Sequence, residues 1–398
     1  MTATGRRAIA WSTGDRIAAP ALIALAFAVV VVTARLVLLF HGHVGDMILL
    51  GDVYGHVGQV PHDVHVWPYT GYDGQFYYRL ALDPFDLHRT AFGITLDSWY
   101  RLVRIGYPTL AWLLSGGQHA AVPYALLAIN VLALATLGLL GGMFARDAGR
   151  NALWGLLVVG FYGFMTSLAR DLTEPLGAVC LMAGLLALRR HRPVLAALLL
   201  AFGSLTLEVV IVVPLALATV RLVEIARRSA RPGAEDLAWI VPGAVFLAWE
   251  VVVKAATGTF PILTDLSHNA GPPLVAAFRA IVHNFAHPTA LVPGAPGAVV
   301  IWDVEFVVLA LFAIGALRSL RETTAPLHER GAFLLSLLVM YSVSPVNWDG
   351  YADLRSFAEV YLLAVLIQFA TPRRWLASYA FSTFPIVFLI AGYRARIL

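Results

Sequence analysis

Long runs of apolar residues recur along the whole chain, and polar segments separate each run from the next. A segment that crosses a bilayer must satisfy its own backbone hydrogen bonds, and continuous rather than alternating apolar runs predict helices instead of barrel strands. The sequence therefore predicts an all-α polytopic membrane protein, a single domain over residues 1–398, with about eleven transmembrane helices. The expected spans are residues 18–40, 121–144, 152–169, 175–188, 194–207, 209–225, 237–256, 299–317, 332–346, 357–370 and 375–391.

The composition supports membrane burial and excludes several other classes of protein. Of the 398 residues, 59% are hydrophobic and only 13% are charged, which is unlike a soluble domain. The net charge of +4 does not indicate nucleic-acid binding, because the arginines form short clusters between apolar runs rather than one basic patch. The single cysteine, Cys180, excludes an intramolecular disulfide. We therefore expect membrane lipids around the chain and no nucleic-acid partner.

The placement of arginine predicts the orientation in the membrane, because cytoplasmic loops carry an excess of basic residues. It places the N-terminus in the cytoplasm, with the first span as an uncleaved anchor in the plasma (inner) membrane. The segment from Arg189 to Arg228 is basic at both ends, so it is expected to cross twice or to re-enter, with Glu208 near the far turn. One long tilted helix is the alternative. The clusters assigned to the cytoplasm are Arg6/Arg7/Arg16, Arg146/Arg150, Arg189/Arg190/Arg192, Arg221/Arg227/Arg228/Arg231, Arg318/Arg321/Arg330 and Arg373/Arg374.

Two polar segments are expected outside the cytoplasm. Residues 41–118 form the longest stretch without a spanning run, and they are rich in Asp, His and aromatic residues. Aromatic side chains of this kind suit short helices at the level of the lipid headgroups. A second, proline-rich loop is expected over residues 257–298. The acids of the chain thus gather on one side of the membrane, where we expect the chemistry.

One short motif in the first loop combines an acid with aromatic residues: Tyr72-Asp-Gly-Gln-Phe-Tyr-Tyr78. Asp73 precedes a helix-compatible segment that Asp83-Pro84 ends, so one interpretation of Asp73 is a helix N-cap without chemistry. The other is a general base at the membrane surface, with a pKa raised under a roof of tyrosines. Replacement of a true base by Asn is expected to cost roughly 100-fold or more in turnover, whereas Asn caps a helix about as well as Asp.

This motif, in the first outer loop of a many-helix protein, resembles the acidic first-loop motif of the GT-C superfamily of membrane glycosyltransferases. The resemblance covers topology over residues 18–260 and, in sequence, only residues 72–78. It implies that Asp73 is the base toward an acceptor hydroxyl, with Asp52 in Gly51-Asp-Val-Tyr-Gly-His56 as the alternative. It also implies a polyprenyl-phosphate sugar as donor, and we expect a glycan, lipid or protein as acceptor. No cofactor is expected.

Other polar residues of the outer side are candidates for substrate binding. Tyr72, Gln75 and Tyr77 belong to the motif. Arg170, Asp171 and Glu174 share one turn, for which a helix cap is the alternative interpretation. An intramembrane carboxylate such as Glu208 is a functional candidate by default. Further candidates are Asp349 and Arg355 in the loop that precedes the span 357–370, and Arg170, Arg279 and Arg355 are candidates to neutralise a phosphate.

Competing functions have weaker signals in the sequence. The loop histidines His41, His43, His56, His62 and His65 have no zinc-site spacing, so we expect no metal. Phosphate-loop, dinucleotide-binding and Gly-x-Ser-x-Gly motifs are absent. A transporter or flippase of lipid-linked sugars or other small anionic substrates is the alternative function. It would place charges along a path at the membrane midplane and often show two related halves.

Overall fold

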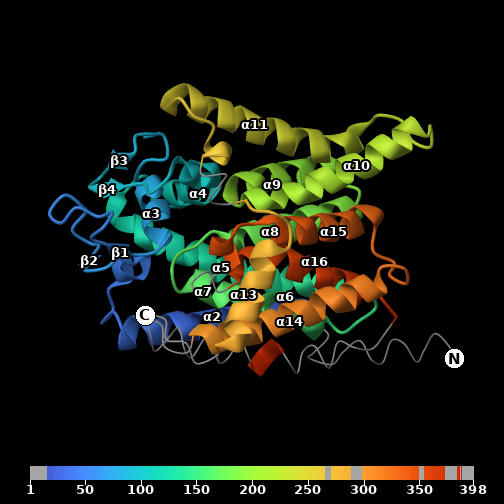
Figure 1. The fold of residues 1–398 in the computed structure, drawn as a ribbon, viewed down its shortest axis with the longest axis horizontal. Coiled ribbons are helices and arrows are strands. Elements are labelled where there is room, and N and C mark those ends of the chain that lie inside the picture. The colour runs from blue at the N-terminus through green and yellow to red at the C-terminus, as the bar shows by residue number, and fades with distance from the viewer. Residues whose placement is uncertain are drawn as a thin grey trace.

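The computed structural model describes residues 16–264, 270–287, 298–348, 354–372, 383–385 and 387. Helices dominate, and most of them run along the long axis of the molecule (Figure 1). Five of the described segments are long and apolar enough to cross a membrane, which confirms a helical membrane protein in this coarser form. These segments are Ala18–Leu38, His119–Asp147, Glu208–Ala226, Ala234–Thr257 and Val299–Ser319.

Each of the five segments contains one helix of the bundle, and further helices pack against these. The helices of the five segments are α2 (Ala18–Leu38), α5 (Val122–Asp147), α10 (Val212–Ala226), α11 (Leu237–Thr257) and α14 (Ala298–Ser319). The further helices are α8 (Glu174–Arg189), α9 (Pro193–Thr206), α15 (Leu327–Ser342) and α16 (Ala358–Phe369). Every residue of α16 is buried, and this helix packs against α14 and α15. A short helix whose residues are apolar except for Glu359 and Gln368 is stable in such a buried position.

One expected span is not a continuous helix. Between residues 152 and 169 the chain forms a 3₁₀ turn, η6 (Ala152–Gly155), followed by α6 (Leu156–Val159) and α7 (Gly163–Leu168). Gly155 lies against α5 so closely that a Cβ there would be 2.1 Å from the backbone nitrogen of Gly142. Gly160 ends α6, and glycine weakens a helix interior. The expected span over residues 375–391 lies almost entirely outside the described residues.

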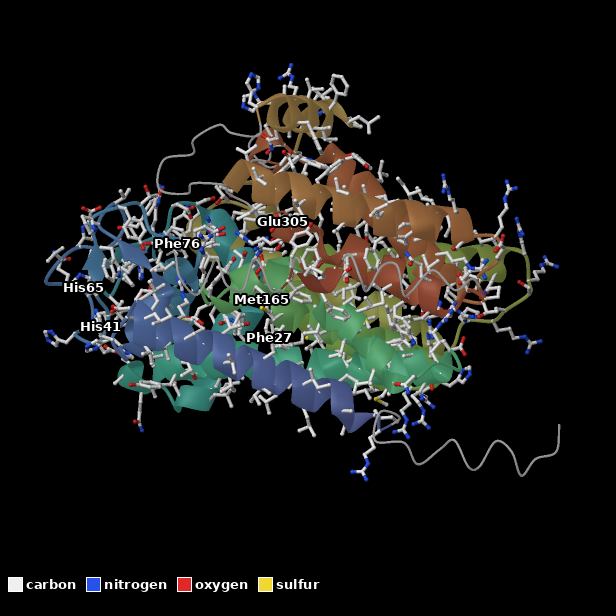
Figure 2. All side chains as sticks on the ribbon, turned by 90° about the horizontal axis from the view of Figure 1, so that it is seen from below. Phe27, His41, His65, Phe76, Met165 and Glu305 are labelled. Carbon is white, nitrogen blue, oxygen red and sulfur yellow. The ribbon has the colours of Figure 1, made fainter. Side chains whose placement is uncertain are left out.

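The first loop folds into a compact region at one end of the bundle (Figure 1). Its helices are α3 (Gly74–Leu82), η4 (Trp99–Arg104) and α4 (Gly106–Ser115). Strand β1 (Leu50–Gly51) pairs in parallel with β2 (Val66–Trp67), and β3 (Thr90–Ala91) is antiparallel to β4 (Ile94–Thr95). Figure 2 shows His41, His65 and Phe76 together at this end, whereas Met165 lies deeper in the bundle. In the second loop, η9 (Pro261–Leu263) and α13 (Val275–Ala286) are described.

Four aromatic residues of the first loop do not lie at its surface, where the sequence placed them. Every residue of α3 is buried, including Phe76, Tyr77 and Tyr78, and Tyr107 of α4 is buried as well. Tyr77 and Tyr78 belong to one hydrophobic core with Ile48 and Tyr107. The expectation of rings exposed at the headgroup level is therefore wrong for these residues, because the loop builds a core of its own. That core gives the motif a rigid support.

Candidate functional site

A cavity of about 490 Å³ lies where the first-loop region meets α8, α10, α15 and α16. One part of its lining is charged and consists mainly of Asp73, Arg101, Arg104, Glu174, Glu208 and Arg355. Another part is apolar and includes Leu207, Val209, Val212, Val339, Met340 and Val343. A cavity with both kinds of wall suits a ligand that has a charged or hydroxylated head and an apolar tail.

Asp73 reaches this cavity because the motif packs tightly against the turn that precedes α8. A Cβ at Gly74 would lie only 2.2 Å from the carbonyl oxygen of Arg170, so the motif needs glycine at this position. Gln75 fixes the same segment from the other side: its amide nitrogen donates to the carbonyl of Thr70, and its oxygen accepts from the backbone N–H of Gly51. Gln75 therefore supports the loop and does not line the cavity, contrary to its expected role in substrate binding.

The carboxylate of Asp73 lies between two arginines. Its Oδ1 is 3.0 Å from Nη2 of Arg101, and its Oδ2 is 2.7 Å from Nη2 of Arg355. The side chain makes no capping hydrogen bond to α3, which removes the interpretation of Asp73 as an N-cap. Burial raises the pKa of Asp73, but the charges of Arg101 and Arg355 outweigh burial and hold it below its usual range. The expectation of a raised pKa is therefore wrong.

Arg355 joins segments that are far apart in the sequence. Its guanidinium group is bonded to Asp73 and, through Nη1, to Oε1 of Glu174, and Nε lies 3.4 Å from the hydroxyl of Tyr72. The second oxygen of Glu174 accepts a hydrogen bond of 2.9 Å from Ser167. The structure thus brings together Tyr72, Asp73, Glu174 and Arg355, all of which the sequence had selected.

Glu208 forms a second charged group in the lining. Arg104 holds both of its oxygens, with Nε 2.7 Å from Oε2 and Nη2 2.7 Å from Oε1, and the hydroxyl of Tyr100 donates to Oε1 at 2.6 Å. Tyr77 does not line the cavity, but its hydroxyl accepts a hydrogen bond of 3.1 Å from Arg104. Tyr77 therefore positions Arg104 instead of contacting a ligand as expected.

Several residues of the lining were missed by the sequence analysis. Arg101 and Arg104 lie on η4. The sequence signal for them was the spacing of two arginines within the aromatic segment Trp99-Tyr-Arg-Leu-Val-Arg104. Asp97 holds Arg101 through two hydrogen bonds, of 2.9 and 2.7 Å. Glu359 on α16 also lines the cavity. It is an acid inside an expected span, and the rule that selected Glu208 applies to it equally.

Other predicted residues lie outside the cavity lining. Asp52, the alternative base, is exposed on the loop region and does not line the cavity. Arg170 stacks on the ring of Tyr72, with Cζ 3.9 Å from the ring centroid. Asp171 is fully buried, and neither of its carboxylate oxygens has a hydrogen-bond donor among the described residues. Burial raises its pKa to about 8. Arg279 is exposed on α13, and Asp349 is outside the described residues.

The turn from Arg170 to Pro175 does not cap α8 through a side chain. Thr173 occupies the position before the helix, but it makes no capping hydrogen bond, whereas Pro175 does lie in the first turn. Within the described part of the chain, no group of three or more His, Cys, Asp or Glu residues is arranged to hold a metal ion. No protein-family model, curated protein or solved structure matches this chain. Its function therefore has to be argued from the cavity.

Proposed function

We propose that this protein is a membrane glycosyltransferase that transfers a sugar from a polyprenyl-phosphate donor to a hydroxyl group of a glycan, lipid or protein acceptor. The observation that carries the proposal is the cavity itself, where Asp73 of the motif meets Arg355, Glu174 and Glu208 beside an apolar wall. The resemblance of residues 72–78 to the GT-C first-loop motif supports the same function. The proposed reaction uses no cofactor.

The lining offers a place for each part of such a donor. The apolar side chains of α10 and α15 suit the first isoprene units, which bind through burial of apolar surface. Arg101, Arg104 and Arg355 suit the phosphate, because guanidinium groups bind phosphate oxygens through paired, charge-assisted hydrogen bonds. Since all three arginines are already paired with carboxylates, a phosphate must compete with Asp73, Glu174 or Glu208 for them. Binding of the donor is thus coupled to rearrangement of the ion pairs.

The proposed reaction is a single displacement with inversion at the anomeric carbon. The acceptor oxygen forms a bond to this carbon while the bond from the carbon to the phosphate oxygen breaks, and the electron pair stays with the polyprenyl phosphate. The arginines stabilise the negative charge of the leaving phosphate. The proton of the acceptor hydroxyl passes to a carboxylate of the cavity, for which Asp73 is the residue that the motif implies.

Transfer can be tested with purified protein in liposomes, supplied with radiolabelled undecaprenyl-phosphate sugars and a membrane extract as acceptor. We expect the label to appear in a new covalent product, and Arg355→Ala to abolish it while Arg190→Ala, which breaks an exposed ion pair with Asp147, does not. Movement of the labelled lipid across the bilayer without a covalent product would contradict the proposal and support the transporter or flippase.

The proposal also requires the cavity to face the side opposite the cytoplasm in the plasma membrane. The only native cysteine, Cys180, is buried, so an introduced cysteine can be labelled selectively. We expect a membrane-impermeant maleimide to label Asp52→Cys in intact cells and His191→Cys only after lysis. The reverse pattern would contradict the proposed orientation.

A further inference from the structure

The carboxylates that line the cavity differ in how completely their oxygens are paired. Both oxygens of Asp73 contact arginines, and both oxygens of Asp97 accept from Arg101. Glu174 is held by Arg355 and Ser167, and Glu208 by Arg104 and Tyr100. Each of these four groups must release an arginine or lose a hydrogen bond before it can take up a proton.

Glu359 is the exception among the described carboxylates of the lining. It is the second residue of α16, its residual exposure is 4%, and its Oε1 has no hydrogen-bond donor in the described part of the protein. No arginine lies within ion-pair distance of it there; the charged groups that act on it from a distance are Glu208, Glu174 and Arg104. Buried oxygens are almost always hydrogen-bonded, so an exception within a cavity wall calls for a partner.

We infer that Glu359, rather than Asp73, accepts the proton of the attacking hydroxyl group. The inference rests on the proposed function and assigns one step of it. The O–H bond of the acceptor breaks as its oxygen bonds to the anomeric carbon, the proton moves to a carboxylate oxygen of Glu359, and the electron pair of the broken C–O bond leaves with the lipid phosphate. The proton passes to water when the product leaves. Asp73 then has a different task, which is to hold Arg101 and Arg355 at the phosphate.

This assignment competes with a purely structural one. An acidic residue in the first turn of a helix is stabilised by the helix dipole, and Glu359 occupies such a position. Glutamine keeps the size and the hydrogen-bonding oxygen of glutamate but accepts no proton. A proton acceptor therefore shows itself as a loss of kcat in Glu359→Gln, whereas a structural role shows itself as a loss of thermal stability.

The first experiment measures transfer from a radiolabelled undecaprenyl-phosphate sugar by Glu359→Gln. We expect kcat to fall roughly 100-fold or more, with KM for the donor within a few-fold of wild type and an unchanged melting temperature. Glu359→Asp should recover part of the activity. The matched control is Glu250→Gln: Glu250 is also buried with one unpaired oxygen, but it lies on α11 outside the cavity lining. Its activity should stay within about twofold of wild type.

The second experiment does not depend on activity. Dicyclohexylcarbodiimide is an apolar reagent that adds to carboxyl groups bearing a proton, and mass spectrometry identifies the modified residue. The ionised form of Glu359 is the proton acceptor, and the reagent traps the fraction of molecules in which this group carries a proton. We expect modification of Glu359, loss of that modification in Glu359→Gln, and protection by undecaprenyl phosphate at Glu359 but not at Glu250. Asp73 should not react, because Arg101 and Arg355 keep it ionised.

The outcomes separate the two proposals. If wild-type protein transfers sugar and Glu359→Gln does so within a few-fold, or if Glu359 resists the carbodiimide while Asp73 reacts, the assignment of the proton acceptor is wrong and the proposed function stands. If wild-type protein transfers no sugar from any donor, the proposed function is wrong even where Glu359 is modified as expected.

Discussion

The two walls of the cavity use carboxylates in different ways. On the wall formed by the first-loop region, Asp73 and Asp97 share Arg101, and Asp73 is also bonded to Arg355. On the wall formed by α16, Glu359 has a buried oxygen that no donor of the described residues reaches. The carboxylates of the loop wall are therefore neutralised by ion pairs with arginines. Under our inference, the carboxyl group of the helix wall is the one that exchanges a proton. An acid in a motif and an acid that does proton chemistry need not be the same residue.

The largest effect on this comparison is expected from Arg355→Ala, because Arg355 is the shared partner of Asp73 and Glu174. Its removal leaves the buried Glu174 with only the Ser167 hydrogen bond and leaves Asp73 with Arg101 as its remaining arginine partner. Breaking a buried pair costs about 3–5 kcal/mol, and under the proposed function the change also removes a ligand of the donor phosphate. We expect transfer to be abolished and the melting temperature in detergent to fall by several degrees. Arg190→Ala is the control, since its pair with Asp147 is half-exposed and worth at most about 1 kcal/mol. Equal effects of the two variants would show that the cavity pairs have no special role.

A smaller effect is expected from Asp73→Asn. Asparagine frees Arg101 and Arg355 for the donor phosphate but leaves Glu359 in place, so we expect KM for the donor to change and kcat to fall less than about tenfold. The resemblance to the GT-C motif implies a loss of roughly 100-fold or more instead. Steady-state kinetics of Asp73→Asn and Glu359→Gln, measured side by side, therefore decide which wall accepts the proton.

Asp171 offers a further comparison, because it is a buried carboxyl group outside the cavity lining whose oxygens have no donor within the described part of the chain. With a pKa raised to about 8 by burial, it keeps its proton in the folded protein where the unfolded chain has lost it. The folded state thus binds more protons above pH 4, and its stability falls as the pH rises toward 8, by at most about 1.4 kcal/mol per unit.

We expect Asp171→Asn to remove this pH dependence. Its melting temperature should exceed that of wild type by several degrees at pH 8 and by little at pH 5, with kcat nearly unchanged. Asp171 has a φ of +51°, a left-handed conformation that asparagine also adopts, so the backbone should not be strained. A melting temperature of wild type that rises between pH 5 and pH 8 as much as that of the variant would contradict the expected protonation of Asp171.

The smallest effect is expected from Asp52→Asn. Asp52 is exposed and outside the lining of the cavity, and exposed substitutions usually change stability by less than about 0.5 kcal/mol. Transfer and melting temperature should both match wild type. A loss of transfer comparable to that of Glu359→Gln would mean that the loop region closes over the substrate and brings Asp52 into the site.

Several features of the site were visible in the sequence, each for a local reason. Apolar runs long enough to cross a bilayer predicted the helical membrane class, and Tyr72 to Tyr78 stood out because acids and aromatic residues are concentrated there. Glu208 was selected as an acid between apolar runs, and the structure places it in the cavity lining. Glu359 satisfied the same rule and was overlooked because the span around it was examined only for its length.

The sequence by itself determined the class of the protein and a short list of candidate site residues, which are the acids and arginines in polar loops or between apolar runs. Only the tertiary structure decided which of them meet. Arg355 lies 282 residues from Asp73, and no local pattern encodes their ion pair or the lowered pKa that results from it. The same holds for the buried aromatic core of the first loop and for the break at Gly160. The physical reason is that hydrophobic pattern acts along the chain, whereas burial and Coulomb interactions act through space and depend on which segments the fold brings together.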